Sequence, residues 1–452
     1  MGLLLVALPA FGAQLSPRQK ELREIYRELV EIDTTHSKGS TGVAARAVAR
    51  RLRAAGFSDR DIRVVGPKPS RLNLVARLKG RAGQKPLLLL AHLDVVEARR
   101  EDWSMDPFRL HERDGYFYGR GSLDDKAMAA ILTQVVIELR HDRVPLDRDI
   151  ILALTADEEG GPDNGVEWLL RNRPELVDAG LVINEGGGGR MKDGRYLQNG
   201  IQASEKSYMT FQLEVRNKGG HSSLPSSDNA IYRLAAALRR LEDQEFPLEL
   251  NGVTRAFFER SARIEEGQIA ADMLAVLSDP PDPDAALRLS RSPSYNAILR
   301  TTCIPTRIEG GHADNALPQL ARATVNCRAM PGHSMDEIEE AMAKSVWDEQ
   351  VTITATEKDT AGPSLAVDAS LLRAVEEVTE AMWPGVPAIP MMSSGATDSR
   401  YFRKAGIPAY GVSGIFVEMD DMRAHGKDER VGVKQFYEGY EFLRRLVTKL
   451  AM

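Results

Sequence analysis

Two side chains that often bind metal ions close an apolar run near the start of the chain. His92 and Asp94 follow the stretch PLLLLA (86–91), whose residues are typical of a buried strand. Because side chains alternate along a strand, residues two apart share one face. Open α/β sheets carry their sites at the carboxyl ends of strands, where this pair would lie. Alone, His-x-Asp is a weak signal, since a buried histidine satisfied by hydrogen bonds looks the same.

Further residues of metal-binding type follow in order along the chain. They are Asp124 in GRGSLDDK, Glu158 and Glu159 in ALTADEEGG, Glu185 in VINEGG and His425 in RAHGKDER. Each one alone has an ordinary structural explanation, such as a helix cap or a solvated turn. Together, two imidazoles and three carboxylates suit two zinc ions that share one bridging carboxylate and keep an open position for water. The series therefore predicts a dinuclear zinc centre, with other divalent metals left open.

The neighbouring residues Glu158 and Glu159 can have two different roles. Neighbours on an extended chain point in different directions, so one can bind metal while the other stays free as a base. We assign the metal ligand to Glu159 and the general base to Glu158. We also expect the Asp94 carboxylate to accept a hydrogen bond from the second ring nitrogen of His92 and so fix its tautomer.

On these motifs the chain resembles the di-zinc metallopeptidase family of aminoacylase, bacterial glutamate carboxypeptidase, carnosinase-type dipeptidases and succinyl-diaminopimelate desuccinylase. The matching motifs run from about His92 to His425. The resemblance implies five zinc ligands, which are His92, Asp124, Glu159, Glu185 and His425. It further implies that Asp124 is the bridge, that Glu158 is the general acid/base and that the Asp124–Asp125 peptide bond is cis.

The resemblance also implies substrate-contacting positions outside the metal-binding motifs. They are His221 in GGHSS, Asn315 in HADNALP, Arg328 in NCRAMPG and Gly395 in SSGATDSRYF. We expect His221 to stabilise the oxyanion, reached when the insert closes or when a second subunit offers it. Arg328, with Asn315 and the Gly395 loop, is expected to hold a substrate carboxylate through charge-assisted hydrogen bonds.

These roles predict a zinc-dependent hydrolase that cleaves an amide bond next to a free carboxylate. A carboxypeptidase or dipeptidase is the leading reading, and an N-acyl amino acid deacylase or desuccinylase is the alternative. In the family that the chain resembles, Glu at the position of Glu185 accompanies carboxypeptidases and deacylases, which argues against a strict dipeptidase. A non-catalytic metal-binding or assembly protein is disfavoured because Glu158, the base, is intact.

The order of apolar segments predicts an α/β fold. Strands alternate with helices as far as about Glu205, which indicates a mixed, largely parallel sheet with helices on both faces. Period-two alternation then begins in MTFQLEVRN (209–217), which predicts an inserted α+β domain with helices on one face of its sheet. We expect a catalytic domain split into 16–206 and 362–452 around an inserted lid or dimerisation domain at 207–361, where DPPDPDAA (279–286) is a loop.

Composition excludes several classes of protein. The chain has 452 residues, 43% hydrophobic and 27% charged, which is ordinary for a globular protein of two or more domains. Its formal charge of −6 gives no reason to expect a nucleic-acid partner, and no apolar run is long enough to span a membrane. The expected partner is a small peptide or an N-acyl amino acid. The oligomeric state stays open, with a homodimer through the insert as one arrangement.

The first residues of the chain are relevant to the cellular compartment of the protein. MGLLLVALPAFGAQL (1–15) has a short apolar core and small residues, like the end of a signal peptide, although it lacks a positive amino-terminal region. We therefore expect export to the periplasm or the cell exterior, with a cytoplasmic location as the alternative.

Cys303 and Cys327 are the only cysteines. They flank a hairpin-like segment, and we expect two buried free thiols rather than a disulfide.

Overall fold

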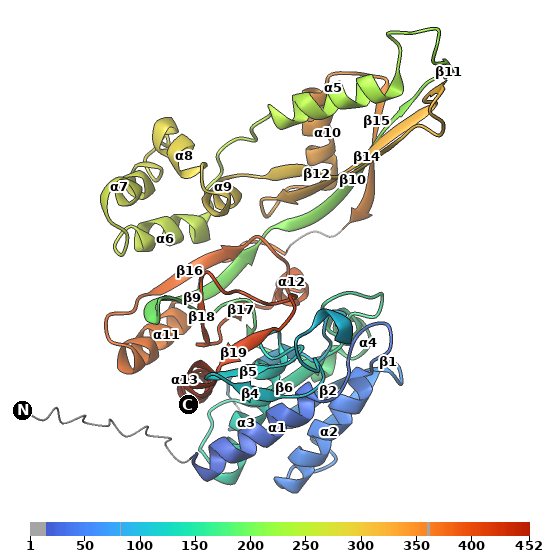
Figure 1. Ribbon diagram of the computed structural model, residues 1–452. Helices are drawn as coiled ribbons and strands as arrows, with labels where there is room; N and C mark the ends of the chain where they lie inside the picture. Colours follow the sequence, from blue (N-terminus) through green and yellow to red (C-terminus); the bar gives the residue numbers. More distant parts are fainter. Residues whose placement is uncertain (1–14, 82, 359–361) are drawn as a thin grey trace, which may run out of the picture.

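The computed structural model describes residues 15–81, 83–358 and 362–452. An α/β domain is built from the two ends of this chain, and an insert with a sheet of its own extends from it (Figure 1). The apolar amino-terminal segment falls almost wholly on residues 1–14, outside the described ranges, so the export prediction stays a prediction. None of the helices in the described ranges is long and apolar enough to cross a membrane.

A mixed sheet forms the centre of the α/β domain. Within the described residues it has ten strands, ordered β1-β2-β6-β3-β7-β17-β9-β8-β18, with β16 also paired to β9. Their bounds are Ile62–Lys68 (β1), Arg71–Leu78 (β2), Ile150–Thr155 (β6), Leu87–His92 (β3), Leu181–Asn184 (β7), Ala409–Gly411 (β17), Arg195–Glu205 (β9), Gly189–Lys192 (β8), Phe416–Glu418 (β18) and Ala388–Ser393 (β16). The central run β6-β3-β7-β17 is parallel, and antiparallel pairs lie toward the edges. The predicted mixed, largely parallel sheet is confirmed.

Helices cover both faces of this sheet. The two faces meet separate apolar cores: along β3, Leu87 and Leu89 face one core while Leu88 and Leu90 face the other. The first core is covered by α1 (Pro17–Val30), α2 (Thr41–Ala54), α3 (Lys126–His141), α11 (Ala369–Met382) and α13 (Val433–Ala451), and the second by α4 (Gly165–Asn172) and α12 (Ser399–Lys404). Continuous burial on both faces explains why these strands read as unbroken apolar runs.

Short elements complete this domain. A small sheet joins β19 (Arg430–Gly432), β5 (Tyr116–Tyr118) and β4 (His111–Arg113), and two 3-10 turns span Arg100–Asp102 and Pro174–Leu176. The first helix begins where its sequence indicates. The Ser16 hydroxyl accepts a hydrogen bond from the Gln19 amide at 3.2 Å, and Pro17 takes the first helical position.

The insert is a second layer of sheet and helix, which we call the lid (residues 207–358). Its sheet is ordered β12-β14-β10-β15, with bounds Thr302–Gly310 (β12), Leu320–Ala329 (β14), Ser207–Arg216 (β10) and Val351–Lys358 (β15). Side chains alternate between buried and partly exposed along β10 and β14, because α5 (Ala230–Glu242) and α10 (Met335–Val346) cover only one face. The predicted α+β insert is confirmed. Its outer end, which we call the lid tip, carries the short pair β11 (Gly220–His221) and β13 (Ala316–Leu317) (Figure 1).

Four helices within the lid sequence were not expected. They are α6 (Gly252–Ser261), α7 (Gly267–Ala275), α8 (Pro283–Leu289) and α9 (Pro293–Leu299). The Pro/Asp-rich stretch predicted as a loop starts α8, where Pro283 stands at the first turn and the Asp282 carboxylate caps the Ala285 amide at 2.8 Å. The prediction of a loop agrees with residues 279–282 but was wrong for 283–286, since proline and aspartate also mark a helix start. The four helices share an apolar core that reaches β16 through Ile389.

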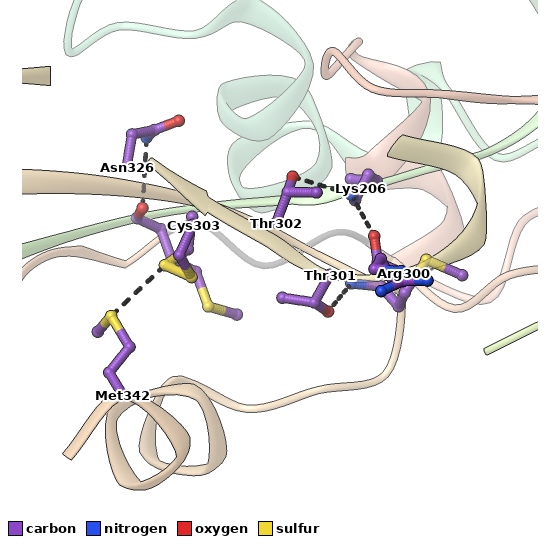
Figure 2. Close-up of a disulfide and its surroundings, with 10 residues drawn as sticks. Lys206, Arg300, Thr301, Thr302, Cys303, Asn326 and Met342 are labelled. Carbon is purple, nitrogen blue, oxygen red and sulfur yellow. Dashed lines mark hydrogen bonds between the residues drawn. A yellow bond between two sulfur atoms is a disulfide. The ribbon is translucent and has the colours of Figure 1, made fainter. Parts of the chain in front are cut away.

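The expectation of two free thiols was also wrong. Cys303 and Cys327 form a disulfide between β12 and β14 (Figure 2). The two residues are direct partners in the antiparallel register, with Cα atoms 4.0 Å apart. The sequence suggested a hairpin between them but could not fix its register, and a shift of one residue would have turned the two side chains to opposite faces.

Candidate active site

Three neighbouring parallel strands bring residues of metal-binding type to one edge of the sheet. Strands β6, β3 and β7 lie side by side. His92 is the last residue of β3, the Glu158–Glu159 pair follows β6, and Glu185 directly follows β7. Because the carboxyl ends of parallel strands meet at the same edge, residues far apart in sequence come together there. The loop before α3 adds Asp124, and the loop between β18 and β19 adds His425.

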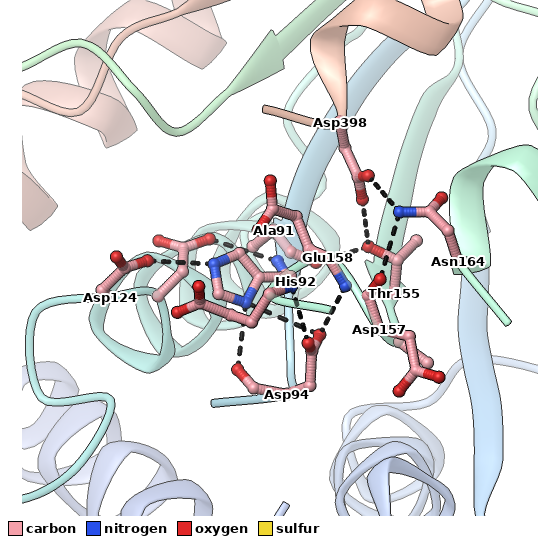
Figure 3. A network of polar contacts seen from close by, with 12 residues as sticks. Ala91, His92, Asp94, Asp124, Thr155, Asp157, Glu158, Asn164 and Asp398 are labelled. Atoms are coloured by element: carbon pink, nitrogen blue, oxygen red, sulfur yellow. Dashed lines mark hydrogen bonds and ion pairs between the residues drawn. The ribbon is translucent and has the colours of Figure 1, made fainter. Parts of the chain in front are cut away.

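The Asp124 carboxylate lies between two imidazoles. Its Oδ1 is 3.0 Å from Nε2 of His92, and its Oδ2 is 3.2 Å from Nε2 of His425. The same nitrogen of His425 lies 2.9 Å from Oε2 of Glu159. One ligand atom each from His92, Asp124 and Glu159 falls within 4.8 Å of the others. Figure 3 shows His92 and Asp124 pointing toward one another.

Glu185 lies beside this group. It lines the same pocket as Asp124, and the charges of Asp124, Asp125 and His92 act on its carboxyl group. The structure therefore places all five predicted ligands at one site, four of them in direct contact. We call these five residues the ligand cluster.

Asp94 does not hold His92 in the way that we expected. Nδ1 of His92 lies 3.0 Å from the main-chain carbonyl oxygen of Asp94, whereas the Asp94 carboxylate is 3.7 Å from that nitrogen. That carboxylate instead accepts hydrogen bonds from the amide of Glu158 at 3.1 Å (Figure 3) and from the amide of Glu159 at 2.9 Å. Asp94 thus fixes the His92 ring through its backbone and the Glu158–Glu159 turn through its side chain.

Electrostatics at the site reflect crowded carboxylates around two imidazoles. Burial raises the pKa of Glu158 well above its ordinary value; the charge on His92 opposes this shift, and Asp398 and Glu185 add to it. Burial likewise raises the pKa of Glu185, with further increases from Asp124 and Asp125. Negative charge is therefore in excess at this edge of the sheet.

The histidines experience the opposite effect. Hydrogen bonds with Asp124 and Glu159 raise the pKa of His425 to about 10. Burial alone would lower the pKa of His92, but its hydrogen bond to Asp124 and the charge of Asp94 raise it well above its ordinary value. Burial favours neutral Asp124, yet its hydrogen bonds with His425 and His92 hold its pKa below the ordinary value.

Two buried carboxylates that the sequence did not single out fix the loops of the site. Glu429 is fully buried, pairs with Arg120 at 2.7 Å and accepts main-chain hydrogen bonds from the segment 121–124. Asp398 accepts hydrogen bonds from Thr155 at 3.2 Å and Asn164 at 2.7 Å (Figure 3). Glu429 follows shortly after His425 in HGKDER, but a charged run of this kind normally indicates a solvated loop, so no sequence signal separated it.

A cis peptide bond joins Asp124 to Asp125. The Asp125 carboxylate accepts a hydrogen bond from the main-chain amide of His92 at 3.2 Å. The loop that carries Asp124 is thereby fixed to the end of β3 as well as to Glu429.

Two of the predicted substrate residues meet at the base of the lid. Arg328, near the end of β14, donates a hydrogen bond to the Ser394 carbonyl oxygen at 3.2 Å, and its guanidinium lies 4.5 Å from the centroid of the Tyr208 ring. Gly395 is the next residue, and its amide donates to the Ser393 hydroxyl at 3.0 Å. The structure thus brings Arg328 and the Gly395 loop together, where the lid joins the α/β domain.

The other two predicted substrate residues lie at the lid tip. His221 forms β11, and the Asn315 carbonyl oxygen accepts a hydrogen bond from the Ser222 amide at 3.0 Å. Both side chains are exposed, and Nδ1 of His221 is 2.7 Å from the Ser223 hydroxyl. Figure 1 shows β11 at the end of the lid that is farther from the ten-stranded sheet. Within one chain the structure does not bring His221 or Asn315 to the ligand cluster.

The donor set of the ligand cluster fits a pair of divalent cations. Imidazole nitrogens and carboxylate oxygens are the ligands that zinc prefers outside thiolate sites. A carboxylate whose two oxygens face two different imidazoles matches a bridging ligand, and the surrounding excess of negative charge suits two cations. The five residues of the ligand cluster would hold the metal.

Fold and site together define a class, the metal-dependent amide hydrolases with a lid inserted into an α/β domain. Residues 88–449 match the model of Peptidase family M20/M25/M40, and the chain belongs to this family. The predicted family resemblance is therefore confirmed, and hydrolase activity follows from membership.

The names of individual relatives refer to different amide substrates. The chain is 32% identical over 382 residues to human N-fatty-acyl-amino acid synthase/hydrolase PM20D1, a match covering 80% of this chain and 74% of that protein. It is 26% identical over 440 residues to mouse aminoacylase-1, covering 94% of each. Among solved structures, an M20 family metallo-carboxypeptidase from Sulfolobus solfataricus has a TM-score of 0.70 at 19% identity, covering 95% of this chain and 98% of that one.

Proposed function

We propose that this protein hydrolyses N-acyl amino acids, releasing a carboxylic acid and an amino acid. The observation that carries the proposal is the ligand cluster, in which one carboxylate lies between two imidazoles beside a second, free glutamate. The substrate class rests on two relatives, an N-fatty-acyl-amino acid synthase/hydrolase and an aminoacylase. This was the alternative reading of the sequence, and the relatives favour it over the leading one.

Two zinc ions held by the ligand cluster would polarise the scissile carbonyl and make water a stronger nucleophile near neutral pH. The side chains that would hold them come from the ends of three strands and from two loops, all fixed by a packed core. Positioning of this kind lowers the barrier because no reorganisation is needed when the substrate arrives.

Glu158 is the proposed general base and then general acid. Its amide is held by Asp94, whereas within the described ranges its own carboxylate accepts no recorded hydrogen bond. A carboxylate in that state is free to take a proton from the attacking water and pass it to the leaving nitrogen.

The proposed anchor for the substrate's free carboxylate is the base of the lid. The Arg328 guanidinium is partly buried against Tyr208, and the Gly395 loop is adjacent to it. A guanidinium in this setting binds a carboxylate through strong charge-assisted hydrogen bonds. Such an anchor favours cleavage beside a terminal carboxylate over cleavage within a long chain.

His221 is proposed to reach the site from the lid tip, together with Asn315. Two routes remain: closure of the lid onto its own domain, or a second chain that offers its tip. The exposure of His221 at the end of the lid supports the second route, which would make a homodimer through the lid the active form. There its imidazole would stabilise the oxyanion.

A carboxypeptidase or dipeptidase is the second candidate, because the same base, ligands and carboxylate anchor would cleave a peptide's last bond. A hydrolysis screen of the zinc-loaded protein separates the two. It would compare N-acyl amino acids, dipeptides and peptides with blocked carboxyl ends. Turnover of N-acyl amino acids with little cleavage of peptides supports the proposal, whereas the reverse order establishes the carboxypeptidase.

The same sample tests the metal centre. We expect two zinc-like ions per chain, and activity that chelation abolishes and zinc restores. Metal analysis that gives one ion at saturating zinc would contradict the dinuclear assignment.

We also propose that the protein is exported. The disulfide between Cys303 and Cys327 supports this, since disulfides persist mainly in oxidising compartments. Cell fractionation with a tagged full-length chain tests the proposal, and recovery of the protein in the cytoplasm with reduced thiols would contradict it.

A further inference from the structure

A small apolar pocket opens beside the ligand cluster. It has a volume of about 220 Å³, and its wall includes Asp124 and Glu185. The rest of the wall is mainly apolar and includes Leu123, Met128, Met391, Ile415, Val417 and Met422. Neither Arg328 nor Gly395 contributes to it, so it is separate from the proposed carboxylate anchor. A pocket on the cluster that lacks the anchor suits the other side of the scissile bond, which is the acyl group.

The size and the lining of the pocket limit that group. Pockets for drug-sized ligands measure roughly 300–1,000 Å³, so this one takes a short acyl chain or one part of a longer chain. Methionine side chains are flexible and adapt to chains of different shape. Met422 is exposed at the pocket's edge, in the loop that leads to His425.

Three carboxylates, Asp124, Asp125 and Glu185, and one cationic side chain, Arg190, lie among these apolar residues. Arg190 lies on β8, where its register partner on β18 is Val417, and it is only partly exposed. Throughout the described part of the chain, no carboxylate forms an ion pair with its guanidinium and no hydrogen bond from it is recorded. Burial lowers the pKa of Arg190, and the Tyr295 hydroxyl acts in the opposite direction.

An unpaired guanidinium in an apolar wall discriminates between acyl groups. A chain that ends in a methyl group would remove water from Arg190 and give it no acceptor in return, which costs free energy. A chain that ends in a carboxylate would give the guanidinium a paired, charge-assisted contact. A site built to meet a polar group rejects the analogue that lacks it more strongly than an apolar pocket rejects an extra methylene.

We infer that this pocket is the acyl subsite and that Arg190 selects short acyl groups carrying a terminal carboxylate. The inference rests on the proposed function and adds the class of acyl group to it. Arg190 pairs with the distal carboxylate, the methionines contact the intervening methylenes, and the scissile carbonyl lies at the ligand cluster. Arg328 meanwhile holds the carboxylate of the amino acid.

The test compares two substrates with the same amino acid and six-carbon acyl groups, adipoyl and hexanoyl. We expect kcat/KM of the zinc-loaded wild-type protein to be at least tenfold higher for the adipoyl substrate. Arg190→Leu should lower kcat/KM for that substrate by about thirtyfold, the loss typical of removing one side of a buried charge pair. It should leave the hexanoyl substrate unchanged or improve it. Arg190→Lys should keep part of the preference, because it keeps the charge.

A matched control lies on the neighbouring strand. Arg195 begins β9 in the same hairpin, is exposed and does not line the pocket. Arg195→Leu should leave both substrates unaffected. Equal losses for both substrates in Arg190→Leu would show a structural role and overturn the inference, as would a wild-type preference for hexanoyl.

Binding separates this inference from the proposed function. The Glu158→Gln protein, loaded with zinc, should bind the adipoyl compound more tightly than the hexanoyl compound, and Arg190→Leu in that background should abolish the difference. Such binding without turnover by the wild-type protein would contradict the proposed reaction but support the acyl subsite. Turnover of both substrates with no difference in affinity would do the reverse.

Discussion

The ligand cluster and the lid tip each carry side chains with a predicted role in the same reaction, yet they are fixed to the fold in different ways. His92 is 2% exposed and lies between strands of a buried parallel sheet, whereas His221 is exposed on a two-residue strand. Positions in the cluster are set by one packed core. The position of the tip relative to the cluster depends on how the lid is placed on the α/β domain.

The junction between the two regions is itself polar and buried. Lys206 links β9 to β10, and its ammonium donates hydrogen bonds to the Arg300 carbonyl oxygen at 2.7 Å and the Thr302 hydroxyl at 3.3 Å (Figure 2). The preceding Glu205 forms a buried ion pair with Arg403. The ligand cluster is therefore formed within one domain. Whether His221 reaches it depends on how the domains, or two chains, are arranged.

The largest effect should come from replacing Glu158 and Glu159, which have different proposed roles. Glu158→Gln should lower kcat by about 10²–10⁴-fold, as loss of a positioned general base does, while two metal ions remain bound. Glu159→Gln should instead lower the metal content, because its carboxylate contacts His425. Metal analysis and kcat on the same preparations check both. An exchange of the two phenotypes would reverse our assignment within the pair.

The next effect tests whether the lid tip acts on the cluster at all. His221→Ala should lower kcat by about 10²–10³-fold, the loss expected for an oxyanion donor. His141→Ala, at an exposed histidine that ends α3, is the matched control and should leave turnover intact.

Mixing two inactive variants distinguishes the two routes for His221. If a second chain supplies the tip, subunit exchange between Glu158→Gln and His221→Ala proteins should restore about a quarter of wild-type activity, because half of the dimers would be mixed and each would hold one intact site. No recovery after demonstrated exchange would establish closure within one chain.

A smaller effect is expected at the base of the lid, where it tests whether Arg328 binds the substrate's carboxylate. Arg328→Ala should cost about 2–4 kcal/mol in kcat/KM for substrates with a free carboxylate, the range for truncating one side of a charge pair. Amidated substrates should already be poor and should lose little more. The ratio of kcat/KM for free and amidated substrates, measured for both proteins, decides the point. Equal losses would show that Arg328 does not bind the free carboxylate of the substrate.

The smallest effect concerns the junction and depends on pH. Burial lowers the pKa of Lys206 to about 7, with a further contribution from Arg328. Below pH 7 the folded state carries a buried charge at a cost. Between pH 7 and about 10 only the unfolded state keeps the proton, so the cost falls by up to about 1.4 kcal/mol per pH unit as pH rises.

Replacement of this lysine should therefore stabilise the protein most in acid. The free energy of unfolding of Lys206→Met minus that of wild type should decrease by about 2–3 kcal/mol between pH 6.5 and pH 9. Loss of the two hydrogen bonds shifts this difference by a constant that does not depend on pH. Denaturant unfolding at a series of pH values measures it, and a difference independent of pH would show that Lys206 is not neutralised on folding.

Much of the α/β domain was predictable because local signals and burial agree there. PLLLLAH, DIILALTA and GLVIN are apolar runs that end in polar residues, and each became a buried parallel strand with a site residue at or after its end. Four lid helices were not predicted, because each is short and because α8 and α9 begin at prolines, which also occur in loops. The Asp94 side chain was misplaced because period two gives a face, not a hydrogen-bond partner.

By itself, the sequence determined which residue types are available for the reaction and the order of the strands that carry them. The types and order of His92, Asp124, Glu159, Glu185 and His425, with the family resemblance that these motifs carry, were enough to predict a metal centre. Only the tertiary structure decided which carboxylate faces both imidazoles, that Cys303 meets Cys327 in register, and that Arg190 lies in a largely apolar wall with no ion-pair partner among the described residues. Those contacts depend on packing between segments that are distant in sequence, and no local pattern encodes the distance between two such segments.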